Sequence, residues 1–336
     1  MRAPEFWWRR DGGGLPGRLL EPAGLLYGWA TARRLARGQP ARLPVPVICV
    51  GNLVAGGAGK TPVVLDIITR LRRDLGLNAV VLSRGHGGRE AGPLRVDPGL
   101  HTAADVGDEP LMMARAGLPV WIARDRADGG RAAVAEGAGA VVMDDGFQNP
   151  ALVQDLPLVV VDGARGFGNG RLVPAGPLRE PVPVGLARAG AVVVMGEDTA
   201  RVARHVPRGV PVLAARIEPG PRVRSWDGQR VVAFAGIGDP DKVFRLLRDV
   251  GCRVVATHPF ADHHPYQPTD IQPILDEAFA LGALPVTTAK DAARLTPDQR
   301  QQVDIIDVTV TWSDPVALDR LLGALAARPP KGHPSE

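Results

Sequence analysis

The feature that most constrains the fold is a glycine-rich turn that directly follows a short apolar run. Residues 47–62 read VICVGNLVAGGAGKTP, which predicts a buried strand, a flexible turn and a helix that begins at Thr61 or Pro62. Glycines allow successive backbone N–H groups to converge on phosphate oxygens, and the amino end of a helix adds a favourable dipole. Pro62 suits a first helical turn, where its missing N–H costs nothing. The segment therefore predicts a phosphate-binding loop.

Two side chains at the end of this loop carry the expected chemistry. Lys60 would reach the β- and γ-phosphates of a nucleotide, and the Thr61 hydroxyl would hold Mg²⁺. Only four of the 40 basic residues are lysines, so a lysine here suggests that a compact ammonium is needed. Val54 stands where the usual pattern opens with glycine, and Gly56 and Gly57 are expected to supply the flexibility instead. The predicted nucleotide contacts are Val54, Ala55, Gly56, Gly57, Ala58, Gly59, Lys60 and Thr61.

Strand-like runs alternate with helical patterns through the first two thirds of the chain. The runs are rich in valine and isoleucine, as is typical of parallel strands covered on both faces. Helical spacing is clearest in Val64, Ile67, Ile68 and Leu71. These patterns predict an α/β fold with a P-loop NTPase-like, doubly wound, mostly parallel sheet. Its strands are expected at 45–51, 78–83, 119–123, 139–144, 157–162 and 190–195.

The pattern changes near residue 207, which predicts a second, smaller α/β domain. Short strands at 211–216 and 221–226 are interpreted as a hairpin or connector. The smaller domain would contain strands at 231–236, 253–257, 284–288 and 303–310, a helix carrying Val243, Leu246, Leu247 and Val250, and a final helix at 314–327. The predicted divisions are an N-terminal segment 1–40, a phosphate-loop domain 41–210, the smaller domain 211–328 and a disordered tail 329–336.

Acidic residues follow the expected strands at places suited to metal or proton chemistry. Asp144 and Asp145 end one strand, where a P-loop enzyme places a second Mg²⁺ contact. Adjacent strand residues face opposite ways, so one of the two would face the metal, and the sequence leaves open which. A plain turn before Gly146 is the alternative. Asp108 is either a helix N-cap or a base for an attacking hydroxyl. The pair His263 and His264 is weak evidence of a metal site on its own.

The first 40 residues combine tryptophan, leucine and arginine. Trp7 and Trp8 precede two arginines, and the leucine-rich stretch 15–30 runs into Arg33, Arg34 and Arg37. Tryptophan beside arginine suits the headgroup layer of a membrane, whereas no run reaches the ~20 apolar residues of a spanning helix. Two interpretations stay open from the residues alone: a monotopic membrane-associated helix, or a helix packed on its own domain.

The composition of the chain argues against a nucleic-acid-binding protein and indicates a reducing compartment. The net charge is +4 and aromatic residues make up 4% of the chain, with arginines scattered along its whole length. A nucleic-acid-binding protein more often shows a concentrated basic stripe with interleaved aromatics. Cys49 and Cys252 lie far apart in apolar runs, which is typical of small buried side chains in a reducing compartment.

Eight segments, in this order, resemble the tetraacyldisaccharide 4′-kinase family of lipid A synthesis. They are VGNLVAGGAGKTP (50–62), LSRGHGG (82–88), VGDEP (106–110), DDGFQ (144–148), RLVPAGPLRE (171–180), AGIGDP (235–240), FADHH (260–264) and TAKDA (288–292). The GPLRE and TAKD pieces have no general structural reason to accompany a phosphate loop. The N-terminal apolar segment also resembles the family's membrane-associated helix, which favours the monotopic interpretation.

The resemblance implies a lipid kinase that uses ATP and Mg²⁺. It would transfer the γ-phosphoryl group to the 4′-hydroxyl of a tetraacylated glucosamine disaccharide 1-phosphate, which forms lipid IV-A. The enzyme would act at the cytoplasmic face of a Gram-negative inner membrane, as a peripheral or monotopic protein. Its partners would be the lipid substrate and the membrane surface, with no nucleic acid and no obligate protein partner.

The resemblance also assigns roles to residues of this chain. Lys60, Arg179, Asp108 and His263 would form the catalytic set, with Arg179 neutralising charge on the transferred phosphoryl group. Asp108 would take the proton of the sugar hydroxyl while His263 orients it, and this pair would be complete only when the two domains close. The residues around the metal and phosphates would be Thr61, Asp144, Asp145, Gln148 and Glu180.

Three positions depart from the family pattern, and two rival functions compete with the lipid-kinase interpretation. His86, Asn149 and Ala289 stand where tyrosine, histidine and glutamate are usual. A P-loop GTPase or metallochaperone-type regulatory NTPase is the first rival, but TAKD has the wrong spacing to read guanine and no cysteine–histidine cluster is present. A peripheral membrane protein with a degenerate nucleotide site is the second, and the retained Lys60 and Asp108 argue against it.

Overall fold

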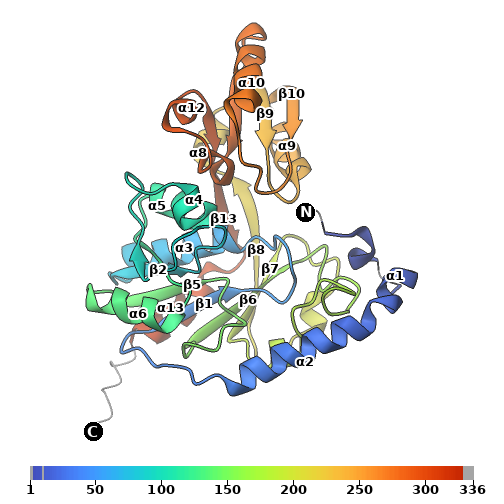
Figure 1. Ribbon diagram of the computed structural model, residues 1–336, viewed down its shortest axis with the longest axis vertical. Helices are drawn as coiled ribbons and strands as arrows, with labels where there is room; N and C mark the ends of the chain where they lie inside the picture. Colours follow the sequence, from blue (N-terminus) through green and yellow to red (C-terminus); the bar gives the residue numbers. More distant parts are fainter. Residues whose placement is uncertain (1–2, 10, 328–336) are drawn as a thin grey trace.

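A nine-stranded sheet forms the larger part of the protein in this computed structural model, which describes residues 3–9 and 11–327 (Figure 1). The predicted tail 329–336 lies outside the described residues. The sheet has the order β13-β8-β7-β6-β1-β5-β2-β4-β3 and is parallel except for the pairs β3–β4 and β8–β13. Its strands are β1 (Val47–Gly51), β2 (Ala79–Ser83), β3 (Leu94–Arg95), β4 (Val120–Ile122), β5 (Ala140–Asp144), β6 (Leu156–Asp162), β7 (Ala191–Met195), β8 (Val212–Pro219) and β13 (Val308–Trp312).

The buried strands and the helix after the phosphate loop form the core that positions the site. Strands β1, β2, β5 and β7 are buried at every residue, as their valine-rich sequences predict. Helix α3 (Lys60–Arg73) buries Val63, Val64, Ile67, Ile68 and Leu71 on one face. The other helices of this part are α4 (Ala103–Val106), α5 (Asp108–Arg115), α6 (Arg126–Ala135), α7 (Val182–Leu186) and α13 (Pro315–Ala326), with the 3-10 turn η2 spanning Val202–His205. The mostly parallel α/β sheet is thus confirmed.

A separate four-stranded parallel sheet forms the upper part of Figure 1. Its order is β10-β9-β11-β12, and its strands are β9 (Arg230–Ala235), β10 (Arg253–Pro259), β11 (Leu284–Thr288) and β12 (Asp304–Ile306). The accompanying helices are α8 (Pro221–Arg224), α9 (Pro240–Asp249), α10 (Pro268–Ala280), α11 (Ala289–Ala292) and α12 (Pro297–Gln301). We call residues 220–307 the small lobe, and residues 41–219 together with 308–327 the large lobe.

The predicted range 211–328 for the smaller domain implies that the end of the chain stays with the small sheet. The structure shows instead that the end of the chain returns to the large sheet. Strand β8 pairs with β7 in the large sheet, and β13 returns to pair with β8. The run 303–310, predicted to be one strand, is divided at Asp307 into β12 and β13. Asp307 interrupts the run because its Oδ1 accepts the Val223 N–H (3.1 Å) and its carbonyl accepts the Gly220 N–H (3.0 Å).

The strand predicted at 221–226 is wrong, because residues 221–224 form helix α8. Pro221 lies in the first turn of this helix, where its fixed φ and its missing N–H are both tolerated. The Val223 N–H, one of the donors without a partner inside the helix, is satisfied by Asp307 instead.

The N-terminal segment lies along one side of the large lobe, at the right and bottom of Figure 1. It contains a 3-10 turn, η1 (Glu5–Trp8), and the helices α1 (Gly14–Leu19) and α2 (Glu21–Arg37). Glu21 and Pro22 interrupt the apolar pattern because α2 begins there. None of the helices in the described part of the chain has the length and apolar character that crossing a membrane requires.

Because the chain returns to the large lobe, we predict that helix α13 stabilises the large lobe. The Leu318 side chain is 0% exposed within the large core, so Leu318→Ala leaves a cavity there. We expect the free energy of unfolding of the large lobe to fall by ~2–5 kcal/mol. The measurement is denaturant unfolding followed by the near-ultraviolet signal. The matched control is Val316→Ala on the same helix, whose side chain is 53% exposed and whose change should have little effect. Equal losses in the two variants would contradict the assignment of α13 to this core.

Candidate active site between the lobes

The phosphate loop occupies the turn between β1 and α3, as the sequence predicts. Helix α3 begins at Lys60, one residue earlier than expected. Gly56 (φ 121°) and Gly59 (φ 81°) adopt left-handed backbone conformations that side chains disfavour, which explains glycine at these two positions. An added Cβ on Gly56 or Gly57 would meet no atom within 4 Å, so the outer side of the loop is open to a ligand.

The first half of the loop is held by the segment that contains the GPLR sequence. The Ala55 N–H donates to the Pro177 carbonyl (2.7 Å), and the Arg179 N–H donates to the Leu53 carbonyl (2.8 Å). Val54 forms an isolated antiparallel bridge with Leu178 and is buried. These contacts explain why a valine is accommodated at the position where glycine is usual. They also give the GPLR sequence a structural reason to accompany the phosphate loop.

Asp145 holds the two predicted phosphate-binding cations together. Its carboxylate accepts a bidentate pair of bonds from Arg179 (2.9 and 3.1 Å) and lies 3.5 Å from Lys60 Nζ. Burial opposes the charge, but Lys60 and Arg179 outweigh it and hold the pKa of Asp145 below its ordinary value. The backbone of Asp145 is left-handed (φ 50°), a conformation that aspartate tolerates better than most residues and that turns its side chain away from that of Asp144.

Asp144 is in the opposite electrostatic situation. It is 3% exposed, and its carboxyl forms no hydrogen bond or ion pair with any residue that the structure describes. Burial, with a further contribution from the nearby Glu109 carboxylate, raises the pKa of Asp144 to about 7. A buried carboxyl group without a protein partner is the kind of ligand that a divalent cation would satisfy.

Gln148 and Glu180 lie beside the loop, but Glu180 is already engaged. Both oxygens of this buried carboxylate accept from Arg188 (2.7 Å), and Oε1 also accepts from Gln148 Nε2 (2.9 Å). Gln148 Nε2 further donates to the Asn52 carbonyl (2.9 Å), at the start of the phosphate loop. Glu180 therefore braces the loop through Gln148. The buried Asn52 Oδ1, by contrast, has no hydrogen-bond partner among the described residues.

Asp108 and His263 meet across the two lobes. Asp108 is the first residue of α5 rather than its N-cap, which is Gly107. Its Oδ2 lies 2.8 Å from His263 Nδ1, although the two residues are 155 positions apart in the chain. The described structure thus already has the closed arrangement that the sequence interpretation required for this pair. His263 also has a left-handed backbone (φ 59°), a strained conformation that is concentrated at functional sites.

Lys290 extends this pair from the other side of the imidazole ring. Its Nζ lies 3.3 Å from His263 Nε2 and 3.4 Å from Glu109 Oε1. An ammonium group can only donate, so its approach to Nε2 favours the tautomer that carries the ring proton on Nδ1. His263 then donates to the Asp108 carboxylate, which is the orientation that a base requires. Lys290 is another of the four lysines of this arginine-rich chain, and the sequence analysis assigned it no role.

Arg294 is a site residue that the sequence interpretation missed. Its Nε lies 3.3 Å from Asp108 Oδ2, as an ion pair without hydrogen-bond alignment, and its Nη2 donates to Asp291 (2.6 Å). Asp291 is fully buried and also accepts from the Gly236 N–H (2.8 Å) and the Tyr266 hydroxyl (2.8 Å). The one available signal was that Arg294 lies one turn beyond the TAKD sequence.

The three departures from the family pattern have different surroundings. The loop that contains His86 packs on Gly107, where an added Cβ would lie 2.5 Å from the His86 carbonyl oxygen. This contact needs only the backbone of residue 86. Asn149 Oδ1 accepts the Ala151 N–H (2.9 Å) and so closes a turn. Ala289 is the first residue of α11, directly after the N-cap Thr288.

Comparisons with known proteins agree with this arrangement. The family model described as tetraacyldisaccharide-1-P 4'-kinase (LpxK) matches residues 17–326. The tetraacyldisaccharide 4'-kinase of Rhodospirillum rubrum is 57% identical over 97% of this chain and 98% of its own. That of Gluconacetobacter diazotrophicus is 52% identical over 96% of this chain and 97% of its own.

A solved structure shows the same fold. The crystal structure of the "apo" form of LpxK from Aquifex aeolicus, in complex with ATP, superposes with a TM-score of 0.73. The two chains are 27% identical, and the match covers 92% of this chain and 99% of that one. Because the family model and the close relatives span nearly its whole length, this chain belongs to the tetraacyldisaccharide-1-P 4'-kinase family.

Proposed function

We propose that this protein is an ATP-dependent kinase that phosphorylates the 4′-hydroxyl of tetraacyldisaccharide 1-phosphate, which forms lipid IV-A in lipid A biosynthesis. Membership of the kinase family supplies the substrate and the reaction. The observation that carries the mechanism is the 2.8 Å contact between Asp108 of the large lobe and His263 of the small lobe. A base assembled from both lobes, in the same protein as a phosphate loop, is suited to transferring a phosphoryl group to a hydroxyl.

In this proposal Asp108 takes the proton from the attacking hydroxyl. His263 donates its Nδ1 proton to one carboxylate oxygen and fixes the direction of the other, while Lys290 keeps the ring in the required tautomer. Arg294 contributes a positive charge 3.3 Å from the Asp108 carboxylate. General-base assistance of this kind contributes typically about 10²–10⁴-fold to a rate.

The phosphate groups of ATP would be bound by the loop N–H groups, Lys60 and Arg179. In the described structure both cations are held by Asp145, so they are placed before the nucleotide arrives. Binding of phosphate oxygens would then exchange one anionic partner for another at little cost in side-chain ordering. Arg179, with its fork of donors, is suited to the oxygens of the transferred group. The Aquifex aeolicus relative was solved in complex with ATP, which supports this assignment.

The residues near the loop fit a magnesium ion, whose preferred ligands are oxygen atoms. Among the residues that the structure describes, the buried Asp144 carboxyl has no hydrogen-bond or ion-pair partner, and the buried Asn52 Oδ1 has no hydrogen bond. Thr61 is the second residue of α3, where its hydroxyl is available to a metal. Asp145 and Glu180 are engaged by arginines, so we place Asp144 as the carboxylate that faces the ion and Gln148 beside it. A bound Mg²⁺ would neutralise charge on the phosphates.

The surroundings of the TAKD sequence favour the kinase over a regulatory GTPase. A GTPase needs a free aspartate to bind guanine, but Asp291 is fully buried and accepts hydrogen bonds from Gly236, Tyr266 and Thr288. Lys290 is directed to His263. Both residues therefore serve the interlobe site.

We further propose that α1 and α2 bind the membrane surface through their outer face. The face of α2 that packs on the large lobe carries only small residues, because the buried residues of this helix are Gly24, Gly28 and Thr31. An added Cβ on Gly28 would lie 2.4 Å from Leu172 Cδ1, so a larger residue here would require the Leu172 side chain to move. The large apolar side chains point outward, and the most exposed are Leu15, Leu19, Leu25, Leu26 and Trp29.

This distribution is the reverse of that in a helix packed only on its own domain, which turns its large apolar side chains inward. Arg33 stacks on Trp29 (5.5 Å), a pair suited to the anionic headgroup layer of the inner membrane. The substrate gives a reason for this surface, because extracting acyl chains from a bilayer costs ~0.8 kcal/mol per CH₂. The enzyme is therefore expected to work at a membrane surface, which we propose is the cytoplasmic face of the inner membrane.

The kinase activity is tested with the purified full chain, Mg-ATP and tetraacyldisaccharide 1-phosphate in detergent. We expect a bisphosphorylated product, detected by mass spectrometry. Lys60→Ala should abolish measurable turnover, and Asp108→Asn should lower kcat by about 10²–10⁴-fold because the base is lost. Asp128→Asn is the control, since Asp128 is exposed and pairs only with Arg131 among the described residues. Wild-type turnover by Asp108→Asn would refute the assigned base.

The environment of Asp144 predicts an unusual pH dependence of stability without metal. The unfolded carboxyl titrates near 3.8, but the folded one titrates at about 7, so the folded state holds an extra proton between these values. Stability therefore falls as pH rises from 3.8 to about 7 and is not recovered above it. Asp144→Asn removes this penalty, so in EDTA its melting temperature should exceed that of the wild type at pH 8 and match it near pH 4.

Asp145→Asn is the matched control for this measurement, with the opposite expected sign. The pKa of Asp145 is lowered, so its stabilising contribution is present at high pH and is lost as pH falls through the folded pKa. The variant should melt below the wild type at pH 8. If Asp144→Asn were also destabilised at pH 8, the buried and unpaired description of Asp144 would be wrong.

The membrane surface is tested by liposome flotation with vesicles that contain anionic lipid. Replacing Leu25, Leu26 and Trp29 by serine should lower the partition coefficient about tenfold or more, because three exposed apolar anchors are lost. ATP binding should not change. These point variants are sharper than deletion of residues 1–40, which also removes the Trp7 contact with the Pro174 carbonyl (3.0 Å).

The control for flotation removes equally exposed apolar groups elsewhere. Phe279→Ser and Leu100→Ser change side chains that are 90% and 79% exposed and lie outside α1 and α2. They should float like the wild type. A similar loss in both sets would show that general hydrophobicity, and not this face, directs the protein to membranes.

A further inference from the structure

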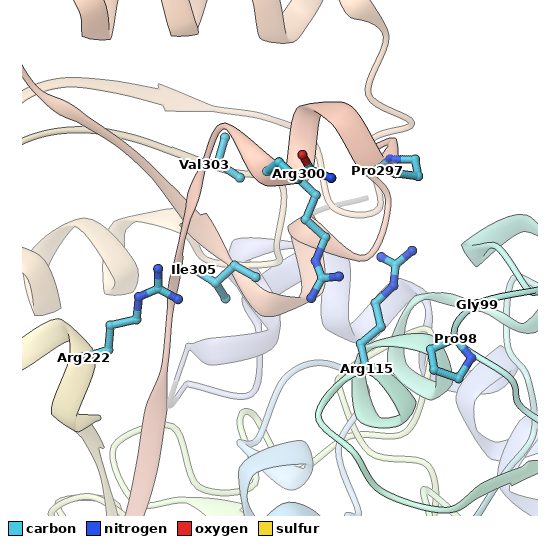
Figure 2. Close-up of a pocket in the computed structure, with 9 residues that line it drawn as sticks. Pro98, Gly99, Arg115, Arg222, Pro297, Arg300, Val303 and Ile305 are labelled. Atoms are coloured by element: carbon cyan, nitrogen blue, oxygen red, sulfur yellow. The ribbon is translucent and has the colours of Figure 1, made fainter.

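A cavity of about 490 Å³ lies between the lobes at some distance from the reacting groups. Figure 2 shows arginine side chains from three different helices around it, from α5, α8 and α12. The side chains of Arg115 and Arg300 extend toward one another across the gap. Its lining residues are Pro98, Gly99, Arg115, Arg222, Pro297, Arg300, Gln301, Val303 and Ile305.

Two of these three guanidinium groups lack a negative partner within the described part of the chain. Arg222 forms an ion pair with Asp304. Arg115 and Arg300 form no ion pair with any carboxylate among the described residues, and no carboxylate lines the cavity. Arg115 is fixed in place because its Nη1 donates to the carbonyls of Ala292 and Ala293 (both 3.2 Å). Burial, and then the nearness of Arg300, lower the pKa of Arg115. Two positive groups held close together repel one another, and an anion that binds both would offset this repulsion.

The cavity is distinct from the catalytic groups but is mechanically connected to them. Arg115 ends the helix that Asp108 begins, so the two lie about 10 Å apart along α5. The carbonyls that Arg115 contacts belong to the segment that follows Lys290. Arg300 comes from the small lobe, so an anion between Arg115 and Arg300 would join the lobes beside the catalytic pair.

The position of the cavity favours a ligand from solution. Helices α5 and α12 lie on the left of Figure 1, whereas α1, which we place at the membrane, lies on the right. Planar guanidinium groups suit the oxygens of phosphate, which can accept two bonds from each. The volume of the cavity exceeds that of a single phosphate ion, so a small phosphorylated molecule also fits.

We propose that Arg115 and Arg300 form a binding site for the phosphate group of a soluble anion, and that this anion holds the lobes closed. The site lies outside the proposed reaction. By reciprocity, an anion that favours closure also favours any ligand that needs the closed lobes. The availability of phosphate would therefore regulate how often Asp108 and His263 are assembled.

The test must avoid the phosphate loop, which also binds phosphate. We therefore use full-length Lys60→Ala protein and titrate it with inorganic phosphate by calorimetry at fixed ionic strength. Adding Arg300→Gln should weaken the affinity about tenfold or more, because one charge-assisted contact is lost. This change is mild for folding, since the Arg300 side chain forms no hydrogen bond within the described residues. Arg300→Lys should restore part of the affinity, and Arg248→Gln, an exposed arginine of the same lobe, is the matched control.

Each outcome decides part of the proposal. Equal phosphate affinity in the Arg300→Gln and Arg248→Gln backgrounds, or no binding in the millimolar range, would overturn the site. Glucosamine 1-phosphate serves as a soluble headgroup analogue, and binding of this compound without binding of inorganic phosphate would overturn the soluble source. Phosphate should also slow amide hydrogen exchange in 260–264 and 288–294 in the Lys60→Ala protein. Binding without slower exchange would overturn the role in closure.

Discussion

The joint between the lobes is the constraint on which the catalytic arrangement depends. The chain leaves the large sheet after β8 and returns before β13, and the Gly220 N–H donates to the Asp307 carbonyl where the two passages meet. An added Cβ on Gly220 would collide with the Asp307 side chain, so a larger residue here would displace the carboxylate that accepts the Val223 N–H. Away from this joint the lobes meet through the largely buried ion pair of Arg294 with Asp108, and also through the partly exposed pairs Arg165–Asp239 and Lys242–Asp162. Partly exposed pairs of this kind contribute little individually. Partly exposed contacts of this kind are typical of interfaces between lobes that move relative to one another, whereas the joint fixes where the chain passes from one lobe to the other.

The surroundings of the acidic residues in the site give them different pKa values and therefore suit them to different roles. Asp144 and Asp145 are neighbours in sequence, yet the pKa of the first is raised and that of the second is lowered. The difference follows from position: Asp144 ends a buried strand, and the left-handed backbone of Asp145 turns its side chain toward Lys60 and Arg179. Two carboxyl groups with separated pKa values are typical of sites that need one group for charge and another for a ligand or proton.

Much of this architecture was predictable because it depends on local patterns. The position of the phosphate loop, the large-sheet strands β1, β2 and β4 to β7, and the pairing of Asp108 with His263 all agree with expectation, whereas the short strand β3 was not predicted. The return of β13 was not predictable, because residues 303–310 form one β-prone run whose break depends on contacts from Asp307 to Gly220 and Val223. Helix α8 was missed for the same reason. Arg294 was missed because its role depends on contact with Asp108, which is distant in the sequence. In an arginine-rich chain, one more arginine does not by itself indicate a functional site.

The segment 169–179 touches two parts of the protein that are otherwise unrelated in sequence. Near its start, the Asn169 N–H donates to the Trp7 carbonyl (2.7 Å) and Arg171 Nε donates to the Gly12 carbonyl (2.8 Å). At its end, Pro177 and Arg179 bond to the phosphate loop. In the proposed membrane-bound state, the height of the nucleotide above the lipid headgroups is thus set by folded structure instead of a flexible tether. A sugar hydroxyl held at a fixed depth in the bilayer would therefore face a phosphoryl donor held at a fixed height above the headgroups.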